Sequence, residues 1–210
     1  MKYLNDEELP KKIKAGEPVV MPSDTIFGLI GSALNLQTVE SIYRLKKRPP
    51  DKPCIILINS LTDLKKFKID LNEKECDTLD NVWPGPVSVI LPCPEKEFTY
   101  LHRGQETLAF RIPNLSWLRH ILQSTGPLLA PSANSAGHPP AETIEQAWSY
   151  FYDNVFYYAR SDFKPTNTPS SLLTIEGNKI KILRQGQGAD RLLNLSSKAR
   201  DPELIDFIKR

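Results

Sequence analysis

One stretch decides how the chain is organised: Leu45-Lys46-Lys47-Arg48-Pro49-Pro50-Asp51-Lys52-Pro53. It places basic residues and prolines between a segment with helical spacing, residues 39–46, and an apolar run typical of a buried strand, residues 54–58. The chain must therefore reverse direction here. Because proline fixes φ and restricts the residue before it, we expect the basic side chains on a stiff loop. The stretch favours an anion grip, and the alternative is a solvated basic helix end stabilised by the helix dipole.

Length and charge bound the class of protein. The chain has 210 residues, enough to bury a large core, and it shows no internal repeat or break in composition. We therefore predict one domain over residues 1–210, with residues 190–210 as a loosely docked tail. The 27 basic and 25 acidic residues give a net charge of +2. This balance excludes a protein that binds nucleic acid by bulk charge, so any basic surface must be local.

The spacing of cysteine and histidine predicts neither disulfides nor a metal site. The three cysteines are odd in number and lie in or beside apolar segments, which fits a reducing compartment. The three histidines lie far apart, so we expect no metal held by protein ligands alone. The N-terminus lacks the apolar segment of a signal peptide, and no apolar run reaches the roughly 18 residues that would span a membrane. A soluble cytoplasmic protein is therefore expected.

Apolar patterns predict alternating strands and helices. Strand patterns occur at residues 19–21, 54–58, 87–91, 107–113, 128–130, 155–159, 170–175 and 179–183, the last two forming a hairpin about Glu176-Gly177-Asn178. Helix patterns occur at residues 5–16, 39–46, 60–64, 72–82, 114–126 with Asn114 as the cap, 142–151 and 202–208. This order predicts an α/β domain on a mixed sheet. Ligands in such folds gather where strand ends open into loops.

Polar residues stand at several of these strand ends. Ser23-Asp24-Thr25 follows one strand, and Ser132 and Asn134 follow another; each group either binds a ligand or only closes a turn. Arg111 is a charge inside an apolar strand, where it needs a partner or an anionic ligand. A GxSxG motif is absent, so Ser132 is not expected to be a hydrolase nucleophile. A binding role is favoured for Ser132 and Asn134.

A series of motifs recurs in a fixed order between residues 22 and 186. The motifs are Pro22-Ser23-Asp24-Thr25-x-Phe27-Gly28-Leu29, Lys46-x-Arg48-Pro49 with Asp51-Lys52-Pro53, Trp83-Pro84-Gly85-Pro86, Arg111-x-Pro113, Pro131-Ser132-Ala133-Asn134 and Ile182-Leu183-Arg184-x-Gly186. The ordered set resembles the YrdC-like threonylcarbamoyl-AMP synthases. The resemblance implies a single-domain, twisted, open mixed sheet with flanking helices and a concave, locally basic cavity for ATP and L-threonine.

The resemblance also implies roles for residues of this chain. ATP would be bound by a set that contains the two expected catalytic residues, Lys46 and Arg48, and continues with Lys52, Thr107, Ser132, Asn134 and Arg184. L-threonine would be bound by Thr25, Phe27, Arg111 and Ser170. Arg111 can form a bidentate pair with an amino-acid carboxylate, and the cations at positions 46 and 48 can offset phosphate charge.

The motifs depart from the family pattern at several positions. Phe27 stands where tyrosine is common, Ser23 where threonine is usual, and Lys47 where glycine is usual. The segment Thr168–Thr174 replaces an acidic residue followed by Ser-Thr-Val-Val-Asp, which weakens the assignment of Ser170. None of these changes removes a residue of the KxR or SxN pair. The chain resembles the short form of the family, without the linker and second domain of longer members.

The implied reaction is the first step in making threonylcarbamoyladenosine on transfer RNA. The threonine amine would take up bicarbonate or carbon dioxide, and the carbamate oxygen would attack the α-phosphorus of ATP with loss of pyrophosphate. Such a reaction depends on positioning and charge compensation more than on a protein nucleophile. Mg²⁺ would bridge phosphate oxygens, with most ligands supplied by ATP and water. A Walker A motif and a GxGxxG motif are both absent.

Two alternatives stay open. The first is a non-catalytic module that binds transfer or ribosomal RNA, although the balanced charge and the lack of aromatic residues among the basic ones count against it. The second is a paralogue of the same fold that does not synthesise the product, which the intact KxR and SxN pairs oppose. The expected partners are the three substrates and a downstream threonylcarbamoyl transferase complex, with at most weak contact with RNA and none with a membrane.

Overall fold

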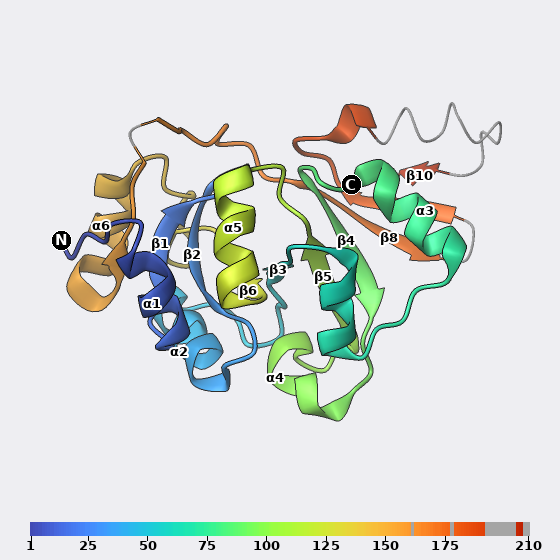
Figure 1. Ribbon diagram of the computed structural model, residues 1–210, viewed down its shortest axis with the longest axis horizontal. Coiled ribbons are helices and arrows are strands. Elements are labelled where there is room, and N and C mark those ends of the chain that lie inside the picture. Colours follow the sequence, from blue (N-terminus) through green and yellow to red (C-terminus); the bar gives the residue numbers. More distant parts are fainter. Residues whose placement is uncertain (161, 177–178, 192–204, 208–210) are drawn as a thin grey trace.

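The computed structural model describes residues 1–160, 162–176, 179–191 and 205–207 (Figure 1). The strands are β1 (Val19–Pro22), β2 (Phe27–Ser32), β3 (Ile55–Leu57), β4 (Val87–Pro92), β5 (Thr107–Arg111), β6 (Leu128–Leu129), β7 (Phe156–Tyr157), β8 (Ser171–Glu176), β9 (Lys179–Arg184) and β10 (Ile205–Phe207). The α-helices are α1 (Glu8–Lys14), α2 (Leu36–Lys46), α3 (Glu73–Val82), α4 (Thr99–His102), α5 (Ser116–Thr125) and α6 (Ile144–Phe151). The 3₁₀ helices are η1 (Leu61–Phe67), η2 (Lys96–Phe98) and η3 (Tyr152–Asn154).

The described strands form one open mixed sheet in the order β10-β9-β8-β4-β5-β3-β6-β2-β1-β7. The pairs β3–β5 and β4–β8 are parallel, whereas β4–β5, β3–β6 and β8–β9 are antiparallel. Strands distant in sequence therefore lie side by side, as where Val87 of β4 pairs with Ser171 of β8. The predicted α/β fold, with one open mixed sheet and flanking helices, is confirmed.

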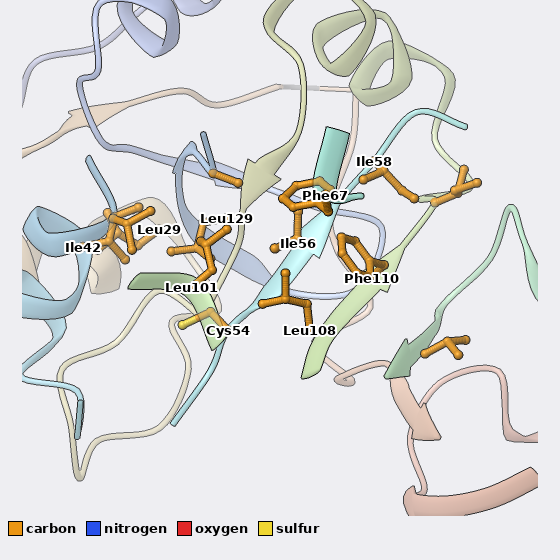
Figure 2. Packing of buried hydrophobic residues seen from close by; sticks show 14 of the residues in the cluster. Leu29, Ile42, Cys54, Ile56, Ile58, Phe67, Leu101, Leu108, Phe110 and Leu129 are labelled. Atoms are coloured by element: carbon orange, nitrogen blue, oxygen red, sulfur yellow. The ribbon is translucent and has the colours of Figure 1, made fainter. Parts of the chain in front are cut away.

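Each face of the sheet has its own hydrophobic core, because successive strand residues point to opposite faces. On one face, Ile56 and Phe110 pack with Phe67 of η1 and with residues of α2, α3 and α6 (Figure 2). The Phe67 and Phe110 rings meet edge to face with their centroids 5.0 Å apart. On the other face, Leu57 packs with residues of α1 and α5.

The second face is only partly covered by helices. In Figure 1, α1 and α5 lie over the half of the sheet that contains β1, β2 and β6. On β5, Phe110 points into the first core, so its neighbours Ala109 and Arg111 point to the second face. There they meet a cavity instead of a helix. The functional site is therefore expected over the β3, β5, β4, β8 and β9 part of this face.

Several local predictions were wrong. The helix expected at 60–64 is the 3₁₀ helix η1, and η2 and α4 were not predicted at all. Asn114 does not cap α5, because the helix starts two residues later, after Leu115, and has no side-chain cap. The predicted helix near the N-terminus is present as α1, and Asn5 Oδ1 accepts the Glu8 backbone N–H at 2.9 Å before it.

The C-terminal prediction needs a larger correction. A helix was expected over 202–208, but residues 205–207 form β10, which pairs parallel with β9. Pairing with an edge strand satisfies backbone groups across the chain and outweighs a weak local helix preference. The remaining tail positions, 192–204 and 208–210, and the hairpin turn at 177–178 lie outside the described residues. Within the described part, no helix is long and apolar enough to cross a membrane.

Candidate active site

A cavity of about 700 Å³ opens over the uncovered half of the sheet. Its floor is apolar and consists of alternate residues from neighbouring strands, namely Ile55, Ile90, Ala109 and Leu172. The walls come from the loops at 23–28, 48–54, 130–132 and 169–170. An apolar floor surrounded by polar groups is typical of a pocket for a small organic molecule with charged substituents.

Charged side chains in the cavity lining are mostly basic. The lining contains Arg48, Lys52, Arg111 and Arg184, and a single carboxylate, Asp51. Because the net charge of the whole chain is only +2, this surplus is local, and it favours an anionic ligand.

Lys46 ends α2 and does not line the cavity. Its successor Lys47 adopts the left-handed conformation, with φ 51°, and turns the chain into the proline-rich loop. The Lys46 side chain is 3% exposed, and its Nζ donates to the backbone oxygens of Ser132 and Asn134 and to Asn134 Oδ1. The expectation that this ammonium group stands on the loop was therefore wrong. It ties the end of α2 to the 132–134 loop.

Burial governs the protonation of Lys46. Loss of hydration, followed by the positive charge of Arg48, lowers its pKa to about 8. The oxygen acceptors at 2.8 Å and 2.9 Å in Asn134 oppose this effect because they favour the charged form. Near neutral pH the group is therefore mostly an ammonium ion.

The loop after α2 is held by its own backbone carbonyls. Arg48 donates from Nε to Lys52 O and from Nη2 to Pro53 O, both at 2.9 Å. The Tyr43 hydroxyl also donates to Lys52 O at 2.9 Å. These hydrogen bonds stiffen the loop in addition to its prolines. They also fix the Arg48 guanidinium at the cavity wall.

The 132–134 loop presents a hydroxyl to the cavity. Ser132 Oγ donates to Asn134 Oδ1 at 2.6 Å, and Asn134 Nδ2 donates to His138 O at 2.6 Å. The hydroxyl therefore contacts an amide and not an imidazole, so the arrangement is not that of an activated hydrolase nucleophile. Ser132 lines the cavity and Asn134 does not; Asn134 Oδ1 instead accepts hydrogen bonds from Lys46 Nζ and Ser132 Oγ.

Arg111 has an internal partner that the sequence did not predict. Its Nη2 lies 3.0 Å from Asp24 Oδ1, and both side chains are buried. Neither Asp24 oxygen nor Arg111 Nε makes a hydrogen bond, so the contact balances charge without using all the donors of the guanidinium. Asp24 also lies on the wall of a separate polar pocket of about 340 Å³. Arg111 also belongs to the lining of the large cavity.

Arg184 is fixed at the end of β9. Its Nε and Nη2 donate to Ser170 O at 3.2 Å and 3.0 Å, and Nη2 also reaches Ser170 Oγ at 3.3 Å. Ser170 Oγ lies 2.9 Å from Ser88 Oγ on β4. Gly186 is required nearby, because a Cβ there would lie 2.2 Å from Pro169 O. The Arg184-x-Gly186 motif therefore seats this arginine against the 169–170 segment.

The turn after β1 both closes on itself and forms a cavity wall. Ser23 Oγ donates to Ile26 O at 2.8 Å and lies 3.1 Å from Thr25 Oγ1. The backbone N–H of Asn167 donates to Thr25 O at 2.9 Å. Ser23 and Thr25 also line the cavity. The two predicted roles of this segment, closing a turn and binding a ligand, are therefore compatible.

Most of the predicted site residues come together in one cavity. Its lining includes Thr25, Arg48, Lys52, Thr107, Arg111, Ser132, Ser170 and Arg184. Lys46 and Asn134 do not line it, and Phe27 is 8% exposed and packs in the first core. The sequence missed Gln105 and the apolar floor. The alternation of residues 107, 109 and 111 on one strand was the signal that could have placed Ala109 beside Arg111.

Comparison with known proteins defines the class. A family model named Sua5_yciO_yrdC, described as "Telomere recombination", matches residues 11–186. The chain therefore belongs to the Sua5/YciO/YrdC family, as its motifs indicated.

Named relatives and solved structures refine this placement. The threonylcarbamoyl-AMP synthase of Vibrio campbellii is 26% identical over 185 residues, which cover 87% of this chain and 99% of the relative. That of Bacillus subtilis is 34% identical over 135 residues, which cover 63% of this chain and 39% of the relative. Pyrococcus abyssi Sua5 complexed with L-threonine is 25% identical with a TM-score of 0.78, covering 88% of this chain.

Two further facts concern chain length and fold. This chain covers 56% of the Pyrococcus abyssi Sua5 chain, so it spans about half the length of that protein. It covers 94% of E. coli YciO, with a TM-score of 0.74 at 17% identity, which shows a shared fold.

Proposed function

We propose that this protein is a threonylcarbamoyl-AMP synthase that converts ATP, L-threonine and bicarbonate into threonylcarbamoyl-AMP and pyrophosphate. The convergence of Arg48, Lys52, Arg111 and Arg184 on one cavity with an apolar floor supports this activity. So do the relatives that carry this name and the structural relative described as complexed with L-threonine. The product is the first intermediate of threonylcarbamoyladenosine formation on transfer RNA.

The chemistry consists of two bond-forming steps. The threonine amine adds to carbon dioxide derived from bicarbonate, which forms the N–C bond of a carbamate and releases a proton. A carbamate oxygen then attacks the α-phosphorus of ATP, the bond to the β-phosphate bridge oxygen breaks, and pyrophosphate leaves. The protein contributes positioning and fixed positive charge, because both reacting molecules are anionic.

The basic residues nearest the 132–134 loop serve the phosphates. Arg48 and Lys52 offset phosphate charge from the stiff loop, and Ser132 offers its hydroxyl to a phosphate oxygen. Lys46 acts indirectly: its ammonium group holds the backbone of Ser132 and Asn134 in place and does not contact the phosphates itself. Thr107 lies on the cavity wall beside the nucleotide.

The opposite end of the cavity serves threonine. Arg111 receives the α-carboxylate, and Thr25 and Ser170 contact the rest of the amino acid. Phe27 has no hydroxyl and lies in the core, so its contribution is to support the turn that carries Thr25.

Magnesium fits this site as a companion of ATP. Among the described residues, no group of three or more His, Cys, Asp or Glu side chains could hold a metal ion. The oxygen donors on the phosphate side of the lining are few, chiefly Asp51 and Ser132. That donor set suits an ion that keeps phosphate and water ligands, as Mg²⁺ does, and the ion would supply charge compensation for the leaving pyrophosphate.

The direct test is turnover by the purified chain. With ATP, threonine and labelled bicarbonate, pyrophosphate should form together with a mixed anhydride of the mass of threonylcarbamoyl-AMP, and omission of any one substrate should stop both. Arg44→Gln, which removes an exposed arginine of α2 away from the cavity, is the matched control and should keep the wild-type rate. Pyrophosphate release that does not depend on threonine would refute the proposal.

We place this activity in the cytoplasm, where a downstream threonylcarbamoyl transferase complex would receive the intermediate. The RNA-binding alternative gains no support from the cavity, whose size and apolar floor suit a small molecule. RNA contact is expected to be weak and dependent on salt.

A further inference from the structure

The polar segment at residues 165–170, Pro-Thr-Asn-Thr-Pro-Ser, contributes only its last two residues to the lining of the cavity. It leads into β8, and a proline near each end restricts its backbone. Pro165 is buried, whereas residues 166–168 are exposed. Exposed loops that reach a cavity often carry functional residues, so the contacts of residues 166–168 bear on the site.

This segment holds the turn that carries Thr25. The Thr25 carbonyl oxygen accepts a hydrogen bond from the Thr166 hydroxyl at 3.1 Å and another from the Asn167 backbone N–H at 2.9 Å. Asn167 adopts the left-handed conformation, with φ 59°, which asparagine tolerates better than most residues. Two adjacent residues thus fix one carbonyl group that lies far from them in the sequence.

A glutamine that follows β9 contacts the same segment. Gln187 Oε1 lies 2.7 Å from Thr166 Oγ1. The Gln187 backbone N–H donates to Pro169 O at 2.8 Å, and its carbonyl accepts the Ser171 N–H at 3.0 Å. Gln187 therefore ties both ends of the segment to the chain that leaves β9. The contacts that join Thr25 O, Thr166 Oγ1 and Gln187 Oε1 are called the latch below.

The latch acts at the amino-acid end of the cavity. Thr25 lines the cavity, and its neighbour Asp24 forms the buried ion pair with Arg111 at 3.0 Å. A shift of the turn would displace both Asp24 and Thr25, because they are adjacent on one backbone. The groups proposed to bind phosphate stand on other loops, at 48–53 and 132–134. Loss of the latch should therefore affect threonine more than ATP.

We propose that Thr166 is a positioning residue for the amino-acid substrate and that Gln187 keeps its hydroxyl in place. This inference rests on the proposed function, in which Thr25 and Arg111 bind threonine. Thr166 acts through the Thr25 carbonyl and not by contact with the substrate. A turn that is fixed before the ligand arrives lowers the cost of ordering the site on binding.

The single proton of the hydroxyl explains how Gln187 contributes. Thr166 can donate fully to only one of its two neighbours, Thr25 O or Gln187 Oε1. A half-turn of the Gln187 amide brings the Nε2 donor to Thr166, and the hydroxyl proton is then free for Thr25 O. The amide can thus orient the hydroxyl toward the turn.

The test measures the KM for threonine, the KM for ATP and kcat in Thr166→Val, Thr166→Ser and wild type. Thr166→Val keeps the shape but loses the hydroxyl. It should raise the KM for threonine about threefold to tenfold, as the loss of one neutral hydrogen bond predicts. Thr166→Ser keeps the hydroxyl and should stay within about twofold of wild type. The KM for ATP and the melting temperature should change little, because residue 166 is exposed.

Thr168→Val is the matched control. It makes the same substitution two residues away, at an exposed position outside the cavity lining. Its KM for threonine should equal that of wild type, and a rise as large as in Thr166→Val would overturn the inference. Calorimetric titration with threonine, in the presence of an ATP analogue that does not react, should give the same ranking of variants without turnover.

Gln187→Met tests the other side of the latch. It removes the amide with little change in shape and should raise the KM for threonine by less than Thr166→Val does, because the Thr166 hydroxyl remains. The double variant should match Thr166→Val alone, since Gln187 acts through that hydroxyl. Effects that multiply in the double variant would contradict the role given to Gln187.

Other outcomes would also decide against the proposal. A folded Thr166→Val variant with the wild-type KM for threonine would overturn it, and so would equal rises in the KM for threonine and for ATP, which indicate a general loosening of the fold. If thermal unfolding shows that Thr166→Val does not fold, Gln187→Met carries the test, and an unchanged KM for threonine in that variant overturns the inference. Wild-type turnover that does not depend on threonine would instead refute the proposed function.

Discussion

Raising the pH from 7 to 9 should weaken ATP binding, because it removes the charge of Lys46. With a pKa of about 8, the charged fraction of this buried lysine falls from about 90% to about 10% over that interval. A neutral amine has two hydrogens for three acceptors, so the contacts to Ser132 and Asn134 cannot all persist. If only the charged form holds the loop in its binding geometry, the affinity for ATP should fall about ninefold.

Calorimetric titration with ATP, at constant ionic strength and without threonine, measures this effect. Lys46→Met should bind ATP weakly at every pH and lack the wild-type decline. Lys47→Met changes the adjacent, exposed lysine and is the matched control; it should keep the decline, and it shares any change due to the ionisation of ATP itself. A wild-type affinity that is constant from pH 7 to 9.5, or a Lys46→Met variant with the full decline, would refute the reasoning.

The same ionisation should increase the contribution of Lys46 to the free energy of unfolding as the pH rises, whereas it decreases the affinity for ATP. The pKa of Lys46 is lowered from 10.5 to about 8 in the folded protein, so the unfolded chain binds more protons between these values. The contribution of Lys46 to the free energy of unfolding therefore rises as the pH increases from about 8 to about 10.5. Urea denaturation of wild type and Lys46→Met across this window should show the difference between them moving in favour of the wild type.

Three further outcomes are expected. Arg48→Ala should fold normally, with a pyrophosphate rate that is lower by about tenfold to a hundredfold, since one charge-assisted contact to phosphate is lost; an unchanged rate in a folded variant would contradict its role. Arg111→Leu should weaken threonine binding at least tenfold and destabilise the fold by about 3–5 kcal/mol because Asp24 stays buried without its partner; calorimetry and denaturation measure both, and Arg111→Leu with Asp24→Asn should recover stability but not affinity. Pyrophosphate release should need no RNA, and retained transfer RNA should dissociate between about 50 and 200 mM salt, as a filter-binding assay would show; tight, salt-resistant RNA binding without turnover would favour an RNA-binding module.

Local sequence patterns predicted the elements of this fold well. The apolar runs on β1, β4 and β5 and the proline-rich reversal after α2 are signals carried by neighbouring residues. The wrong predictions occur where a distant partner decides the conformation. Residues 205–207 form a strand because β9 is available beside them, which no local pattern contains.

The site was predicted as a set of residues but not as a set of contacts. Most of the residues that the resemblance assigned to the site, including Arg111 and Ser170, lie in the cavity lining. The motifs did not show that Lys46 donates hydrogen bonds to the 132–134 loop or that Asp24 forms an ion pair with Arg111. Each of these contacts joins segments more than 80 residues apart. The direction of a side chain depends on the packing of those segments, which sequence spacing does not specify.

The parallel pairing of β4 with β8 has a consequence for how the protein is made. Val87 finds its partner Ser171 only after a long intervening stretch of chain has been synthesised, and closing so long a loop precedes any gain from the contacts it permits. During translation the cavity therefore stays incomplete until β8 and β9 have left the ribosome, because Ser170 and Arg184 belong to its lining. A nascent chain released before β9 would contain the proline-rich loop at 48–53 but lack Arg184. In the full-length chain, bound substrate would favour the complete fold by mass action.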